Sequence, residues 1–214
     1  MVIRAVAIVI ALLAGVARGD EAVVEVARFA EGDRSGWQAQ RFQGETEYTF
    51  ETVDGRLGLR ASSDGTASGL VRRLTVDLTR TPYLEWWWRV QDVPEGVDER
   101  SRSGDDYAAR VYVIVSGGLA FWRTRSLVYV WSSNQPIGST WDNAFTSNAR
   151  VMALRSGDRD AGRWVLERRN LVADFRQLFG DGIAEIDAVA IMTDTDNSGQ
   201  SATAWYGDVT FVAE

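Results

Sequence analysis

The feature that most constrains the fold is a succession of short segments in which apolar and polar residues alternate. Successive side chains of a β-strand point to opposite faces, so this alternation is typical of strands with one buried face. Asp54 and Gly55, between two such segments, predict a tight hairpin turn. The segments predict roughly ten to eleven strands at the spacing of an all-β sandwich. They cover residues 22–29, 46–53, 56–62, 68–78, 82–91, 106–115, 126–133, 149–157, 162–170, 186–194 and 202–212.

One segment, residues 170–180, has the periodicity of a helix instead. Asn170 can cap its first turn and Gly180 can end it. Its apolar side chains fall on one helical face: Leu171, Phe175, Leu178 and Phe179. We therefore predict an all-β fold, a jelly-roll-like antiparallel β-sandwich with one short helix, in a single domain of residues 20–214.

The first residues have the pattern of a secretory signal peptide. Arg4 is followed by an unbroken apolar run over residues 5–16, and small residues precede a cleavage site near Gly19. A membrane anchor is the alternative, but it needs about 20 apolar residues, and Arg18 ends this run. We predict a cleaved signal peptide at residues 1–19. The mature protein is then periplasmic or secreted from a bacterium and has no membrane anchor.

The amino-acid composition excludes several kinds of active site and cross-link. The chain has no cysteine, histidine or lysine, and all 23 basic residues are arginine. This excludes disulfides, a histidine base, a cysteine nucleophile, a lysine Schiff base and histidine-ligated zinc. The net charge of −7, without a basic stripe, argues against a nucleic-acid partner. The oligomeric state is left open.

Three consecutive tryptophans occupy the middle of the segment 82–91. One face of this strand is apolar and is assigned to the core: Leu84, Trp86, Trp88 and Val90. The other face mixes aromatic and charged side chains: Tyr83, Glu85, Trp87 and Arg89. Glu85, Trp87 and Arg89 are therefore candidate ligand-binding residues, because an exposed indole between charged groups can stack on a sugar ring. The alternative is that Trp87 packs under a loop with Arg89 over its ring.

A second group of candidate ligand-binding residues ends a long loop and begins the next strand. Asp105 and Asp106 close the loop, and Arg110 and Tyr112 follow on the same strand face as Asp106. An arginine and a tyrosine side by side can meet a polar ligand. The alternative is that Arg110 pairs with a carboxylate on a neighbouring strand, such as Glu85.

Near the C-terminus, Asp194, Asp196, Ser198 and Gly199 follow the first half of a calcium-loop pattern. Oxygen ligands at alternate positions suit a hard cation. The pattern therefore predicts calcium as the possible cofactor, held by Asp194, Asp196 and a backbone carbonyl. The twelfth position is Trp205 where an EF-hand needs glutamate, so an EF-hand is rejected. The alternative is an Asx-rich turn without metal.

Several stretches together resemble the bacterial domain-of-unknown-function family 3047 (DUF3047), and they cover nearly all of the chain after residue 20. The stretches are SGLVRRLTVDLTRTPYLEWWWRV, DDYAARVYVIV, LVYVW, VMALRSG and AVAIMTDTDNSG followed by ATAWYGDVTF. This resemblance implies membership but no activity. A weaker architectural likeness is to galactose-binding-like carbohydrate-binding jelly rolls, through GDRSGW at 32–37 and WYGDV at 205–209.

The function predicted first is an exported, non-catalytic binding module for a carbohydrate or another polar small molecule. Two long connections, 92–105 and 134–148, are expected near the binding groove because loops between strands commonly carry binding residues. One alternative is a glycan-active hydrolase or lyase that uses carboxylates or an oxygen-ligated metal. A second alternative is a structural envelope protein whose aromatic residues form only the core.

Overall fold

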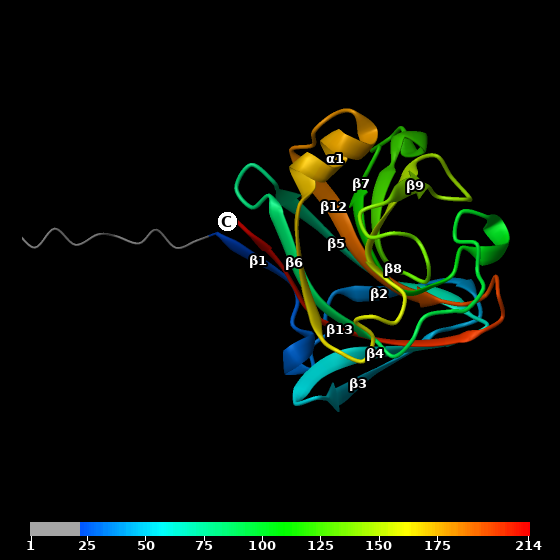
Figure 1. Cartoon of the computed structure of the whole chain (residues 1–214). Coiled ribbons are helices and arrows are strands. Elements are labelled where there is room, and N and C mark those ends of the chain that lie inside the picture. The colour runs from blue at the N-terminus through cyan, green and yellow to red at the C-terminus, as the bar shows by residue number, and fades with distance from the viewer. Residues whose placement is uncertain (1–21) are drawn as a thin grey trace, which may run out of the picture.

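The computed structural model describes residues 22–214, so the predicted signal peptide at 1–19 lies outside the described residues. Two β-sheets pack face to face (Figure 1). The first sheet has the order β11-β6-β13-β4-β3, and β1 also pairs with β13. Its strands are β1 (Val23–Ala27), β3 (Glu47–Val53), β4 (Arg56–Asp64), β6 (Tyr83–Val90), β11 (Val165–Asn170) and β13 (Ser201–Val212).

The second sheet has the order β2-β5-β12-β7-β8-β10-β9. Its strands are β2 (Trp37–Gln43), β5 (Ala67–Asp77), β7 (Tyr107–Val115), β8 (Arg125–Ser132), β9 (Thr140–Asp142), β10 (Ala149–Ser156) and β12 (Glu185–Asp194). Within residues 22–214 every strand pair is antiparallel except β8 and β10, which run parallel. The predicted all-β sandwich is confirmed, with one parallel pair added to it.

Each segment with alternating residues forms a strand, and the predicted hairpin at Asp54 and Gly55 joins β3 to β4. Both residues have positive φ, 52° and 76°, as a tight hairpin turn of the mirror-image type requires. Two strands were not predicted, β2 and β9. Six of the seven residues of β2 are exposed, so it carries no alternation of buried and exposed side chains.

The core between the sheets is built from aromatic side chains. Trp86 and Trp88 of β6 are 1% and 0% exposed, which confirms that this face of the strand is buried. Across the sheet interface, Trp86 stacks on Tyr129 of β8 at 5.2 Å between ring centroids. Trp88 meets Trp131 of the same strand edge-on at 5.7 Å. These contacts hold the two sheets together by aromatic packing at distances that favour such pairs.

The predicted helix is α1, Leu171–Phe179. The Asn170 side chain accepts a hydrogen bond from the backbone N–H of Ala173, and Gly180 ends the helix with φ 84°. Short 3-10 turns occur at η1 (Phe29–Glu31), η2 (Arg102–Gly104) and η3 (Phe121–Arg123). Among the residues described, helices are all too short or too polar to cross a membrane.

Candidate functional site

The outer face of the first sheet carries a group of tryptophans and arginines, which we call the tryptophan face: Arg56, Trp87, Arg89, Trp164 and Trp205. Trp87 is half-buried and projects from β6 away from the core. The guanidinium carbon of Arg56 lies 3.7 Å from the centroid of its ring and 5.6 Å from that of Trp164. Arg56 therefore lies against both indoles, at distances typical of cation–π contacts.

Trp164 reaches this face from the segment just before β11, and two glycines make room for its ring. A Cβ added to Gly58 would come within 2.6 Å of the Trp164 ring. One added to Gly207 would lie 3.6 Å from that ring and 2.8 Å from the Cβ of Trp87. The indole N–H of Trp164 donates to the backbone oxygen of Val53 at 3.0 Å. The ring is therefore held across β4 and β13 by packing and by one hydrogen bond.

Charged groups surround the third tryptophan of this face. The guanidinium of Arg89 lies 4.6 Å from the ring centroid of Trp205, and its Nε is 3.4 Å from Asp54. The indole N–H of Trp205 donates to Glu51 at 2.8 Å. Glu85 contacts Arg168 of β11 at 3.4 Å. The face thus combines indole rings with carboxylates and guanidinium groups that remain partly open to solvent.

Arg110 and the predicted aspartates lie elsewhere, on the second sheet. Arg110 is 3% exposed, and it donates to both carboxylate oxygens of Asp194 and to the side chain and backbone oxygen of Asp105. Its guanidinium also lies 4.3 Å from the ring centroid of Tyr107. Burial raises the pKa of Asp194, and the charge of Arg110 acts against that rise. Arg110 therefore pairs with a carboxylate on a neighbouring strand, as the alternative prediction held. The partner is Asp194 and not Glu85, which pairs with Arg168 instead.

The carboxylates predicted to hold calcium come together with a third. Oxygen atoms of Asp106, Asp194 and Asp196 lie within 4.8 Å of one another. Asp106 accepts hydrogen bonds from the backbone N–H groups of Asn197 and Ser198, and Asp194 is held by Arg110. Asp196 accepts a hydrogen bond from the side-chain amide of Asn197 at 3.1 Å, so all three carboxylates already have partners. This engagement favours the Asx-rich turn without metal, and both that turn and calcium binding stay predictions.

The two long connections, 92–105 and 134–148, lie against each other over the outer face of the second sheet. Nε of Arg102 donates to the backbone oxygen of Ala144, and the side-chain amide of Asn143 donates to Asp105. Beneath them is a second apolar cluster: Tyr107, Val128, Val130, Trp141, Ala149, Val151 and Ala153. These connections therefore cover a small core of their own.

The residues predicted to bind ligand consequently divide between two sheets. Three of them lie on the tryptophan face: Glu85, Trp87 and Arg89. The alternative prediction placed Arg89 over the Trp87 ring, but the guanidinium that lies there belongs to Arg56. The other four lie on the second sheet: Asp105, Asp106, Arg110 and Tyr112. One groove lined by all seven is excluded by this division, and ligand contact by any of them stays a prediction.

Sequence reasoning missed Arg56 and Trp164. The available signal was a glycine inside each of two neighbouring strands, Gly58 and Gly207, which marks a place where another group approaches closely.

The sequence matches the family described as "Protein of unknown function (DUF3047)" over residues 35–210. The chain belongs to the DUF3047 family. The predicted resemblance is therefore confirmed, and the matched region includes both the tryptophan face and the Arg110 cluster. No match to a curated protein is found.

Among solved structures, this DUF3047 chain is similar to the family 30 carbohydrate-binding module of the cellulosomal cellulase Cel9D-Cel44B of Clostridium thermocellum. The TM-score is 0.52 at 13% identity, covering 90% of this chain and 98% of the module. The xyloglucanase domain of NopAA from Sinorhizobium fredii gives 0.45 at 11%, covering 85% and 96%. A Cel12A-derived cellulase of Rhodothermus marinus gives 0.46 at 10%, covering 87% and 99%. At such identities the first likeness shows a shared fold, and the other two carry no further argument.

Proposed function

We propose that this protein is an exported, non-catalytic glycan-binding module and that the tryptophan face contacts the glycan. The observation that carries the proposal is the pair of partly exposed indoles, Trp87 and Trp164, on one outer sheet face. Charged, planar side chains lie beside them, and Trp205, only 6% exposed, packs under Arg89. The fold shared with a carbohydrate-binding module supports the same ligand class.

The chemistry of this face suits a sugar. An indole ring offers a flat apolar surface to the C–H face of a pyranose, and a rigid ring loses little entropy on binding. Hydrogen bonds already hold two of these rings in place, from Trp164 to Val53 and from Trp205 to Glu51. Side chains at the border remain open to solvent, with Glu51 48% and Arg168 43% exposed, and can bind hydroxyl groups.

A glycan array probed with the wild-type protein and with Trp87→Ala tests the proposal. We expect the wild type to bind at least one glycan class and Trp87→Ala to lose most of that signal. Trp122→Ala is the matched control, because Trp122 is 62% exposed and lies in η3 outside the tryptophan face. A blank wild-type array would remove the carbohydrate interpretation, and equal loss in both variants would remove the tryptophan face as the contact. Thermal melts of each variant exclude unfolding as the cause.

The export proposal rests on the pattern of residues 1–19 and is tested separately. The full-length gene product is expressed in a Gram-negative host, and its periplasmic fraction is analysed by intact mass. We expect a mature chain cleaved near Gly19. A cytoplasmic chain with its N-terminus uncut would contradict export while leaving glycan binding open.

A further inference from the structure

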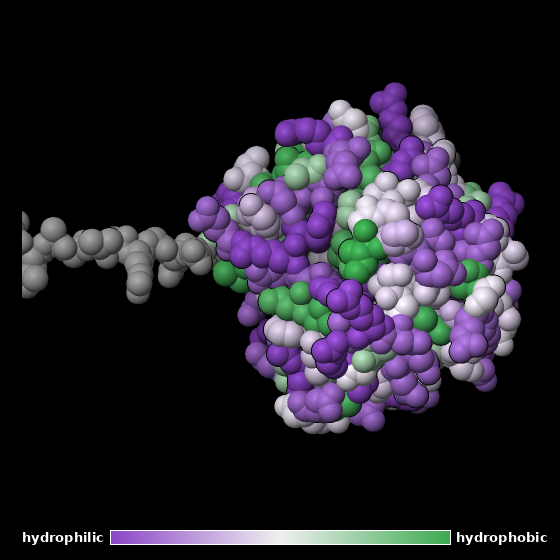
Figure 2. All heavy atoms as spheres, viewed as in Figure 1, coloured by the Kyte–Doolittle hydropathy of each residue, from purple (hydrophilic) through white to green (hydrophobic). Residues whose placement is uncertain are grey.

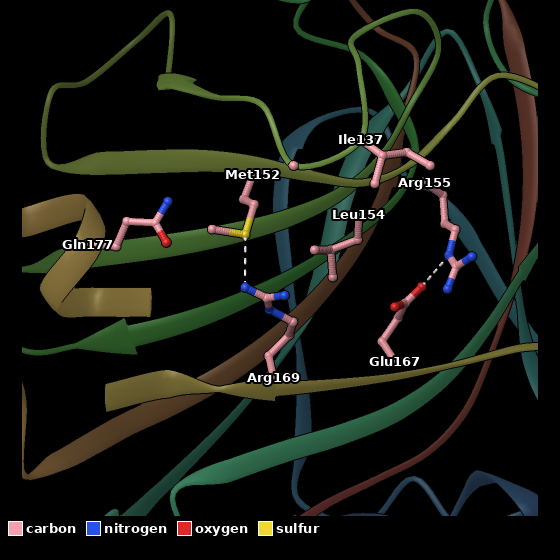
Figure 3. Close-up of a pocket in the computed structure, with 8 residues that line it drawn as sticks. Ile137, Met152, Leu154, Arg155, Glu167, Arg169 and Gln177 are labelled. Carbon is pink, nitrogen blue, oxygen red and sulfur yellow. Dashed lines mark hydrogen bonds and ion pairs between the residues drawn. The ribbon is translucent and has the colours of Figure 1, made fainter. Parts of the chain in front are cut away.

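A cleft separate from the tryptophan face opens where edges of the two sheets diverge beside α1. Its volume is about 450 Å³, within the roughly 300–1,000 Å³ typical of small-molecule sites. Residues of β10, β11, α1 and the connection before β9 line it (Figure 3): Ile137, Gly138, Met152, Leu154, Arg155, Glu167, Arg169 and Gln177. Figure 2 shows an apolar patch below α1, enclosed by hydrophilic residues, on the face that Figure 1 turns to the viewer.

One wall of the cleft is a chain of hydrogen bonds that reaches the core. Nε of Arg155 donates to Oε1 of Glu167 at 2.6 Å. The same oxygen accepts the indole N–H of Trp88 at 3.2 Å. Glu167 is 8% exposed, so its carboxylate is held firmly between a core tryptophan and an arginine at the wall. A buried carboxylate needs such partners to stay charged.

The second wall is built in the same way. Arg169 donates through Nε and Nη2 to both oxygens of Asp174, at 2.9 and 2.6 Å. Asp174 also accepts the hydroxyl of Tyr129 at 2.6 Å, and Nη2 of Arg169 contacts the sulfur of Met152 at 3.5 Å. Arg155 also contacts Asp160 at 3.3 Å, so every arginine of the cleft is paired with at least one carboxylate. The walls therefore carry strong dipoles and no unpaired positive charge.

Polar atoms are left over after these pairs have formed. Within residues 22–214, Nη2 of Arg155, Nη1 of Arg169, Oε2 of Glu167 and the side-chain amide of Gln177 make no protein hydrogen bond. In Figure 3 the apolar side chain of Leu154 lies between the head groups of Arg169 and Glu167. Donors and acceptors therefore alternate around an apolar floor.

We propose that this cleft is a second binding site, for a neutral polyhydroxylated molecule with the size of a single hexose. A hydroxyl group both donates and accepts, so it matches walls that offer both kinds of partner. The C–H groups of a sugar ring match the apolar floor formed by Met152 and Leu154. Walls without an unpaired positive charge give an anion no electrostatic advantage, which separates this ligand class from acidic sugars. The site does not depend on the tryptophan face.

The test monitors each of the two sites by the NMR signal of an indole N–H that belongs to that site. In a ¹⁵N-labelled protein every indole N–H gives a separate signal, assigned by single Trp→Phe variants. D-glucose, D-galactose and D-mannose are titrated separately to concentrations of about 10 mM, with D-glucuronate as the charged comparison. We expect the Trp88 signal to shift with at least one hexose, because its indole N–H bonds Glu167. Glucuronate should bind more weakly than that hexose.

Two substitutions complete the experiment. Ile137→Trp adds bulk at the mouth of the cleft, where Ile137 is 57% exposed; it should weaken hexose binding by about tenfold or more. Leu119→Trp is the matched control, since Leu119 is fully exposed and lines no part of the cleft. No Trp88 shift with any hexose, tighter glucuronate binding, or equal effects of both variants would overturn the proposal. Shifts confined to Trp87, Trp164 and Trp205 would overturn it while supporting the tryptophan face.

Discussion

Arg110 on β7 donates to both carboxylate oxygens of Asp194 at the end of β12, and neither side chain is more than 4% exposed. Their strands are neighbours in the second sheet, and the same arginine binds Asp105 at the end of the 92–105 connection. This buried pair therefore joins two strands and a loop, and removing Asp194 leaves Arg110 in the protein interior with Asp105 as its remaining carboxylate partner.

Asp194→Asn is expected to lower the free energy of unfolding by about 1.5–3 kcal/mol, the usual contribution of a hydrogen bond to a charged group, because Arg110 keeps Asp105 as a partner. Urea titration followed by circular dichroism measures it. Asp196→Asn is the control: Asp196 is only partly buried and makes no ion pair among the described residues. Its substitution should change stability by no more than about 0.5 kcal/mol. Equal losses in the two variants would show that the Arg110 pair contributes little.

Calcium should leave the melting temperature unchanged. Asp194 already neutralises Arg110, and Asp106 is engaged by two backbone N–H groups, so a cation would have to displace these partners. Differential scanning calorimetry with millimolar calcium against a chelator measures the effect. A rise in melting temperature with calcium that disappears in Asp196→Asn would instead establish a calcium site at this turn.

Gly58→Ala is expected to destabilise the protein by about 1–3 kcal/mol, the cost of overpacking a filled space. The new Cβ would lie 2.6 Å from the Trp164 ring and 3.0 Å from the backbone oxygen of Tyr206. Near-ultraviolet circular dichroism should report the displaced indole. Gly182→Ala serves as the comparison, because its Cβ would meet nothing closer than 3.5 Å and that atom belongs to the flexible Arg176 side chain. A stable Gly58→Ala protein with unchanged spectra would mean that Trp164 is mobile.

The ionisation of Asp33 should make the free energy of unfolding depend on pH in the acidic range. Hydrogen bonds from Ser35 and from Arg28 lower the pKa of Asp33 to about 2, whereas an unfolded aspartate titrates near 3.9. As the pH falls from about 4 to 2, the unfolded chain takes up its proton first, so the free energy of unfolding decreases. A carboxyl ¹³C titration gives the pKa. Asp33→Asn should flatten this part of the pH profile, and an unchanged profile in this variant would contradict the role of Asp33.

The sequence predicted the strands well because each has one face in the core, and alternation records burial directly. The helix was predicted from its caps, Asn170 and Gly180, which act within a few residues. β2 was missed because it joins the second sheet mainly through its backbone and leaves its side chains exposed.

The candidate sites depend on sheet order, which the sequence pattern does not contain. Trp87 meets Arg56 only because β13 lies between β6 and β4 and carries Gly207 beneath the Trp87 side chain. The cleft beside α1 forms between β10 and β11, which follow one another in the chain but belong to different sheets. Local alternation could assign Trp87 to an outer face but could not say what lies beside it.

The position of β13 has a consequence for how the protein acquires its structure. This strand is the last of those in residues 22–214, yet it pairs with β1, β4 and β6. Until residues 201–212 have been synthesised, the β3–β4 hairpin and β6 have no strand to join them. A nascent chain emerging N-terminus first therefore cannot complete the first sheet until residues 201–212 have left the ribosome. Pairing the first strand with the last requires closing a very long loop, which favours slow folding.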